Sequence, residues 1–202
     1  MVHFANPRIV MGNYKITNRL FVILIFISST FISPGQTNGN EYYPLKPNLK
    51  AKYYIDNNGD SLYFELLSHH KQLNKHLYIT EQGYRIYKGG ISLLRECYYR
   101  NESGNVYIIY DGEKSETLFL PFRPKVGQTW FLSDKGWQWK VVSIDATFTA
   151  ASGKFNDLLK IQEFDLEIPE DTATYFSYFK KGIGLIARTR NGVIEMEYIV
   201  QK

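Results

Sequence analysis

Residues 120–161 read LPFRPKVGQTWFLSDKGWQWKVVSIDATFTAASGKFNDLLKI, and this stretch decides the fold class of the chain. From Trp137 to Val141 every second residue is large and apolar, which is the period of two that a β-strand imposes on its faces. Val142 and Ile144 then make the opposite face apolar as well. We therefore expect a strand here whose far end is buried on both sides.

Turn signals bound this strand at both ends. The residues Asp134-Lys135-Gly136 separate it from 129–132, and Ala151-Ser152-Gly153 separates it from the apolar run 158–161. Short loops that contain Gly between alternating segments indicate antiparallel hairpins. The stretch therefore predicts three consecutive antiparallel strands.

Similar segments fill the rest of the chain, and no helical period persists for three turns. We assign Glu81-Gln82-Gly83 to a hairpin turn, 68–76 to a polar connection and the acidic run 163–171 to a loop. The predicted fold class is all-β, an antiparallel meander of short strands that forms a curved sheet, a barrel or a sandwich. Strands are expected at 53–55, 61–67, 77–80, 84–87, 106–110, 117–122, 174–179 and 193–200.

Three of these segments also carry a resemblance to a known group. LPFRPKVGQTW (120–130), ATFTAASGKFNDLLKI (146–161) and YFKKGIGLIARTRNG (178–192) resemble, in order and spacing, exported bacterial β-rich proteins with "vG-tW", "aGtF--cLki" and "G-GLv" hairpin motifs. Leu158 stands where that group usually has Cys. The resemblance implies an exported all-β protein, and it supplies no catalytic residues to transfer.

The N-terminus has the order of a secretory signal peptide. Lys15 and Arg19 precede the apolar run 20–27, and small and polar residues follow. The alternative is a membrane anchor, but a span needs about 20 apolar residues. We predict a signal peptide at 1–37, a polar N-terminal tether at 38–50 and a single all-β domain at 51–202. The expected location is the periplasm or the extracellular space.

Charge and cysteine content limit the partners. The formal net charge is +4, but Arg8, Lys15 and Arg19 lie in the predicted leader, which leaves 21 basic against 20 acidic residues. A mature chain near neutrality gives no electrostatic reason to expect nucleic acid as a partner. Cys97 is the only cysteine, so no internal disulfide can form.

The sequence contains three candidates for chemistry, and each has a simpler interpretation. Clustered imidazoles such as His69, His70 and His76 can bind a metal, but their spacing fits no standard site, so we interpret them as solvated. Cys97, within an expected strand, is interpreted as a buried structural thiol. The glycines of Gly182-Ile183-Gly184 match a dinucleotide fingerprint, but no helix pattern follows them. We predict no metal and no cofactor.

Trp130, Trp137 and Trp139 are the candidate binding residues, because indoles stack on sugars or line apolar cavities. The alternative, which we favour, is that they are core. The leading hypothesis is an exported non-enzymatic domain that binds a small molecule or an envelope component and does not span a membrane when mature. The alternative is a secreted hydrolase with dispersed acids or histidines. Catalytic residues and oligomeric state stay open.

Overall fold

A computed structural model of the chain describes residues 39–55, 61–132, 136–168 and 173–199. The chain divides into two units, Met1–Ile32 and Ser33–Lys202, and every described residue belongs to the second. The predicted signal peptide therefore lies outside the described residues. Among the described residues no helix is long and apolar enough to cross a membrane.

The described residues form an all-β structure, which confirms the predicted fold class. The strands are β1 (Lys50–Ile55), β2 (Ser61–Leu73), β3 (His76–Tyr87), β4 (Gly90–Glu102), β5 (Asn105–Tyr110), β6 (Thr117–Leu120), β7 (Thr129–Leu132), β8 (Trp137–Ala150), β9 (Gly153–Asp165), β10 (Tyr175–Lys180), β11 (Gly184–Arg190) and β12 (Val193–Tyr198).

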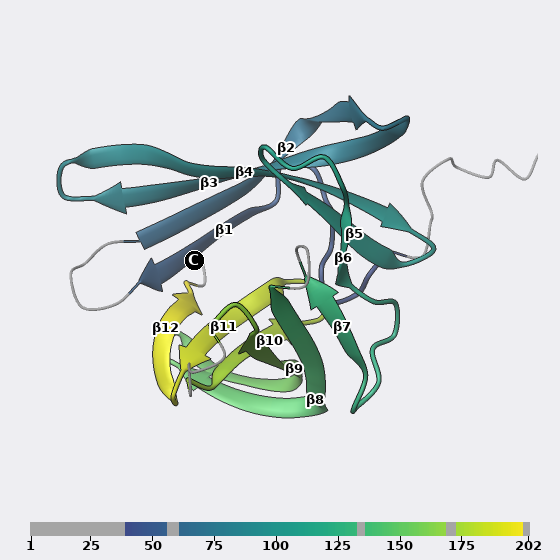
Figure 1. Cartoon of the computed structure of the whole chain (residues 1–202). Coiled ribbons are helices and arrows are strands. Elements are labelled where there is room, and N and C mark those ends of the chain that lie inside the picture. Colours follow the sequence, from purple (N-terminus) through teal and green to yellow (C-terminus); the bar gives the residue numbers. More distant parts are fainter. Residues whose placement is uncertain (1–38, 56–60, 133–135, 169–172, 200–202) are drawn as a thin grey trace, which may run out of the picture. The chain divides into compact units, whose positions relative to one another are not determined.

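All these strands belong to one antiparallel sheet, with the order β6-β5-β4-β3-β2-β1-β12-β11-β10-β9-β8-β7 (Figure 1). The pairing of β1 with β12 joins the first and last described strands in the middle of the sheet. The two edge strands also meet, since Trp130 Nε1 on β7 donates to the Phe119 carbonyl on β6 at 3.2 Å. The sheet is therefore curved into a nearly closed, barrel-like form.

The inner face of this sheet encloses the main core. Its members come from most strands, and aromatic rings fill much of it. The segment before β1, predicted as a polar tether, contributes to it: Tyr42 is buried, and Tyr43 packs against the rings of Tyr99 and Phe119 at 5.2 and 4.8 Å. Asn40, also buried, donates to the Gly104 and Pro121 carbonyls at 3.1 and 3.0 Å. This segment is thus packed against the sheet.

Two long hairpins add smaller clusters on the outer face. The β2–β3 pairing shifts register between Leu66 and His70, and the β8–β9 pairing shifts at several points after Val141. Such bulges bend strands. One outer cluster contains Tyr78, Tyr98 and Ile109. The other contains Leu158, Tyr178, Ile186 and Ala187, with Phe148 and Phe155 of the β8–β9 hairpin packed against it.

Several predicted turns are strands in the structure. Residues 81–83, predicted as a hairpin turn, lie in the middle of β3, because β3 pairs with both β2 and β4 along this length. Gly83 does not form a turn. It allows the Phe64 ring to lie close to the backbone of β3, because a Cβ at position 83 would be 2.7 Å from that ring. The predicted connection 68–76 is mostly strand, and the predicted loop from 163 begins inside β9.

The far end of β8 also differs from expectation. Val142 and Ile144, predicted to be buried, are 37% and 46% exposed. The partner strand β7 pairs with β8 only as far as Lys140, so no strand continues beside this edge. Apolar residues on one face of a strand therefore do not by themselves show that other residues cover that face.

Candidate functional site

The inner face of the sheet surrounds a cavity of about 480 Å³. This volume is within the range of roughly 300–1,000 Å³ that is usual for small-molecule pockets. Most lining side chains are aromatic or aliphatic, and the polar ones are two arginines, three glutamates and a serine. The lining residues are Tyr43, Pro44, Leu49, Ala51, Tyr53, Phe64, Leu66, Glu81, Arg95, Tyr99, Tyr110, Glu113, Phe119, Leu132, Trp137, Trp139, Glu163, Ser177, Phe179, Ile183, Gly184, Leu185, Arg188 and Met196.

The structure brings the three tryptophans together, but only two of them line the cavity. Trp137 and Trp139 share the inner face of β8, as their alternation predicted. Trp130 packs behind Trp139, with ring centroids 5.8 Å apart, and is not a lining residue. Trp139 is 6% exposed and belongs to the main core. Core packing and cavity lining are therefore two roles of one side chain here.

The first polar group of the cavity is centred on Glu163 of β9. Arg188 Nη2 donates to Glu163 Oε2 at 3.0 Å, and the Ser177 hydroxyl donates to Oε1. The rings of Trp137 and Tyr175 lie 5.6 and 5.2 Å from the guanidinium carbon of Arg188. Burial raises the pKa of Glu163, and the Arg188 charge opposes this shift. Both carboxylate oxygens thus have donors, as a buried charge requires.

Arg188 has one short polar contact, to Glu163, and its other polar contacts are weaker. Its Nη1 also lies 3.9 Å from Glu195 Oε2. Its Nε is buried and has no hydrogen-bond partner within the described part of the chain. A molecule in the cavity cannot reach that nitrogen without a rearrangement of the packing around it.

The second polar group is centred on Glu81 of β3. The Tyr43 hydroxyl donates to Glu81 Oε2 at 2.8 Å, and the Tyr99 hydroxyl lies 3.4 Å from Oε1. Burial raises the pKa of both tyrosines well above the usual value, so both hydroxyls remain donors. Arg95 Nη2 is also 3.4 Å from Oε1, a long contact for a charge-assisted hydrogen bond. The shortest contact of Glu81 is therefore the one with Tyr43, and not the one with the arginine.

Arg95 sits on a stack of side chains in this wall of the cavity. Its guanidinium carbon lies 4.8 Å from the centre of the Phe64 ring, and that ring lies directly over Gly83. The Arg95 side chain is 46% exposed, although Glu81 is only 8% exposed. The arginine is thus in contact with Phe64 on one side and open on the other.

Sequence reasoning did not identify Glu81 or Glu163 as site residues, because it assigned them to a turn and to a loop. A weak signal was present in each case. Ile79 precedes Glu81 by two residues and Ile161 precedes Glu163 by two, so each acid continues the inner face of a strand. Arg95 lies on the neighbouring strand β4, and Arg188 lies on β11, two strands away from Glu163, so no sequence spacing indicates these pairs.

The other candidates have structural interpretations. His70 and His76 are exposed on β2 and β3, as expected for solvated side chains, and the His69 side chain is not described. Cys97 is buried, as predicted, and burial raises the pKa of its thiol to about 12. Gly182, in the turn between β10 and β11, and Gly184, the first residue of β11, both have positive φ, and no helix follows them. The described residues hold no group of acids, His or Cys able to bind a metal.

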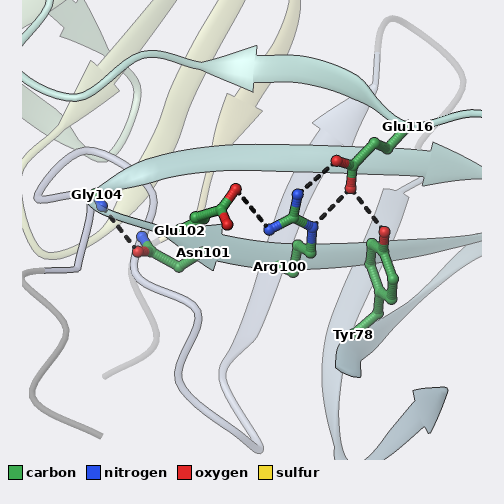
Figure 2. A network of polar contacts seen from close by, with 6 residues as sticks. All are labelled: Tyr78, Arg100, Asn101, Glu102, Gly104 and Glu116. Atoms are coloured by element: carbon green, nitrogen blue, oxygen red, sulfur yellow. Dashed lines mark hydrogen bonds and ion pairs between the residues drawn. The ribbon is translucent and has the colours of Figure 1, made fainter. Parts of the chain in front are cut away.

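Another polar network lies outside the cavity, on the outer face of β4 (Figure 2). Arg100 Nε donates to Glu116 Oε2 at 2.6 Å, and Arg100 also contacts Glu102 at 3.1 Å. The Tyr78 hydroxyl donates to the same Glu116 oxygen at 2.6 Å. Arg100 lowers the pKa of Glu116. These contacts connect Glu116, just before β6, with β4 and β3. Because Arg100 and Glu116 are paired with each other, we do not treat this network as a candidate site.

Comparisons with known proteins add little about function. No family model matches the chain, and no curated protein sequence matches it. A solved structure from Bacteroides fragilis, of a protein regarded as exported and with a YmcC-like fold, is similar at 9% identity and a TM-score of 0.46. The similarity covers 79% of this chain and 97% of that chain. A likeness this distant carries no functional argument.

Proposed function

We propose that this chain is an exported, non-enzymatic β-domain that binds a small, largely apolar ligand in its interior cavity. The observation that carries the proposal is the cavity itself, about 480 Å³ of space lined mainly by aromatic and aliphatic side chains. Ligand pockets typically combine such a lining with a few polar groups that fix orientation. Here the two Glu–Arg groups are those polar groups.

The tryptophans support a binding role for the β8 wall. Trp137 is only partly buried, so part of its indole faces the cavity. Trp139 packs with Trp130 and Phe179, at ring distances of 5.8 and 6.2 Å. Rigid aromatic walls provide contact area at a low cost in conformational entropy. We propose Trp137 and Trp139 as ligand contacts and Trp130 as their support.

The test is binding of the neutral fluorophore phenylnaphthylamine to the full chain purified without detergent. Energy transfer from the tryptophans to the fluorophore reports that it is bound to the chain, and the variant described next assigns the bound fluorophore to the cavity. We expect saturable binding at one site per chain. An absence of saturation would contradict the proposed function.

A cavity-filling variant makes the test specific. Ala51→Phe places a ring into the cavity without deleting an existing contact, and it should weaken fluorophore binding by roughly tenfold or more. Thr147→Phe adds the same ring at an exposed position of β8 and serves as the matched control. Equal affinities of the two variants would place the fluorophore elsewhere.

A hydrolase is the second candidate function, and one observation favours it. Glu81, Glu113 and Glu163 all line the cavity, and a raised pKa such as that of Glu163 is typical of a general acid. Against this, Glu163 is paired with Arg188, and Glu81 is bonded to Tyr43. Turnover of chromogenic esters or glycosides that is lost in Glu163→Gln would favour the hydrolase over the binding domain.

A further inference from the structure

The cavity contains two arginines, and they differ in how much hydrogen-bonding capacity they have left. Arg188 has a contact of 3.0 Å to Glu163 and one of 3.9 Å to Glu195, its Nε is buried, and its side chain is 32% exposed. Arg95 has one long contact, from Nη2 to Glu81, and its side chain is 46% exposed. A guanidinium has five N–H donors in a planar fork. Of the two arginines that line the cavity, Arg95 is therefore the one with more donors available to a ligand.

We infer that the ligand is an amphiphile whose anionic head, a carboxylate or a phosphate, pairs with Arg95 while its apolar body lies among the aromatic side chains of the cavity. This inference rests on the proposed function and names the ligand class. The planar fork of arginine matches carboxylate and phosphate oxygens, often with two parallel hydrogen bonds. An apolar body alone would leave these donors unused.

The surroundings allow Arg95 to serve a ligand without losing Glu81. The Glu81 carboxylate also has hydrogen bonds from Tyr43, at 2.8 Å, and from Tyr99, and its contact with Arg95 uses only Nη2. Nη1 and Nε of Arg95 remain for the head group, so one guanidinium bridges the two anions. The Glu81 charge therefore does not have to be displaced.

The stack beneath Arg95 fixes where the head group lies. Phe64 supports the guanidinium at 4.8 Å and rests on Gly83, where a Cβ would overlap its ring. A cation that is stacked on an aromatic ring keeps its N–H groups directed outward in the plane. The head group therefore lies at the rim of this stack.

The first experiment compares ligands that differ only in the head, on the full wild-type chain. Dodecanoate, dodecyl phosphate and dodecanol compete with bound phenylnaphthylamine at neutral pH. We expect at least one of the two anions to bind roughly tenfold or more tightly than dodecanol. The tighter of the two anions assigns the head as carboxylate or phosphate.

The second experiment removes the guanidinium. Arg95→Met should reduce the affinity for the anions to that for dodecanol, and Arg95→Lys should recover part of the difference. The matched control is Arg123→Met, because Arg123 is exposed, is not a lining residue and also stacks on a phenylalanine, Phe122, at 4.8 Å. It should leave all three affinities unchanged.

The outcomes separate the inference from the proposed function. Equal binding of dodecanol and the anions to wild type, or a preference that survives in Arg95→Met, would overturn the anionic head and leave the cavity as a binding site. Failure of all three ligands together with failure of phenylnaphthylamine would overturn both.

Discussion

The two polar groups of the cavity have the same components, a buried glutamate and an arginine on a neighbouring part of the sheet, but they are built differently. Around Glu163 the arginine contact is 3.0 Å, and Arg188 is further held by two aromatic rings. Around Glu81 the arginine contact is 3.4 Å, and tyrosine hydroxyls supply the other donors. Arg188 is therefore firmly held in its wall of the cavity, and we call its pair with Glu163 the locked group. Arg95 is held more loosely in the other wall.

This difference suggests how a packed interior can also bind a ligand. Breaking a buried ion pair costs about 3–5 kcal/mol, so the locked group is expected to be structural. A pair with a half-exposed arginine resembles a surface pair, which is worth about 0–1 kcal/mol. The cavity then has a rigid wall at β8–β11 and an adjustable group at β3–β4. The following variants test that contrast.

The largest effect is expected from Trp139→Ala in the rigid wall. Trp139 is 6% exposed and packs with Trp130, Phe119 and Phe179. Deleting a buried large aromatic should cost roughly 3–5 kcal/mol of unfolding free energy, measured by denaturant titration. Phe131→Ala on β7, where the ring is 44% exposed, is the control and should cost about 1 kcal/mol or less. Similar costs would mean that the β8 wall is not tightly packed.

Next in size is Glu163→Leu, which leaves Arg188 and the buried Ser177 hydroxyl without their acceptor. Arg188 is 32% exposed and can be partly hydrated, so we expect a loss of about 2–3 kcal/mol rather than the full value for a buried pair. Glu102→Leu removes a glutamate that is 56% exposed and should cost less than about 1 kcal/mol. Equal losses would contradict a locked pair.

The sequence predicted much of the fold and little of this contrast. The alternation from Trp137 to Val141 predicts a strand and its inner face, because every second side chain of a strand points to the same face. Glu81 and Glu163 break the apolar pattern at positions that are nevertheless buried. Their burial depends on Arg95 and Arg188, which come close to these carboxylates only when the sheet forms. A single sequence contains no local signal for such partners.

The pH dependence of stability provides a smaller test of the locked group. Because burial raises the pKa of Glu163 above its usual 4.5, the folded chain holds this proton more tightly than the unfolded chain. The contribution of this proton to the unfolding free energy is therefore fully present below about pH 4.5, and it is lost as the pH rises through the folded-state pKa. Glu163→Gln should remove this loss.

The comparison of unfolding free energies between wild type and Glu163→Gln isolates this group from others of opposite sign. Arg100 lowers the pKa of Glu116, so the stability that Glu116 contributes is lost as the pH falls. That contribution is common to both chains and cancels in the difference. A difference that does not change with pH above 4.5 would mean that the Glu163 pKa is not raised.

The smallest effect is expected for the coupling between Glu81 and Arg95. Gln at position 81 still accepts the Tyr43 hydrogen bond, and Met at position 95 still packs on Phe64. In a double-mutant cycle of Glu81→Gln and Arg95→Met, unfolding free energies should give a coupling of less than about 1 kcal/mol, as for surface pairs. A coupling above about 2 kcal/mol would show that Arg95 is held as firmly as Arg188. Arg95 would then have no freedom to serve a ligand, and the adjustable group would have to be sought elsewhere on the cavity wall.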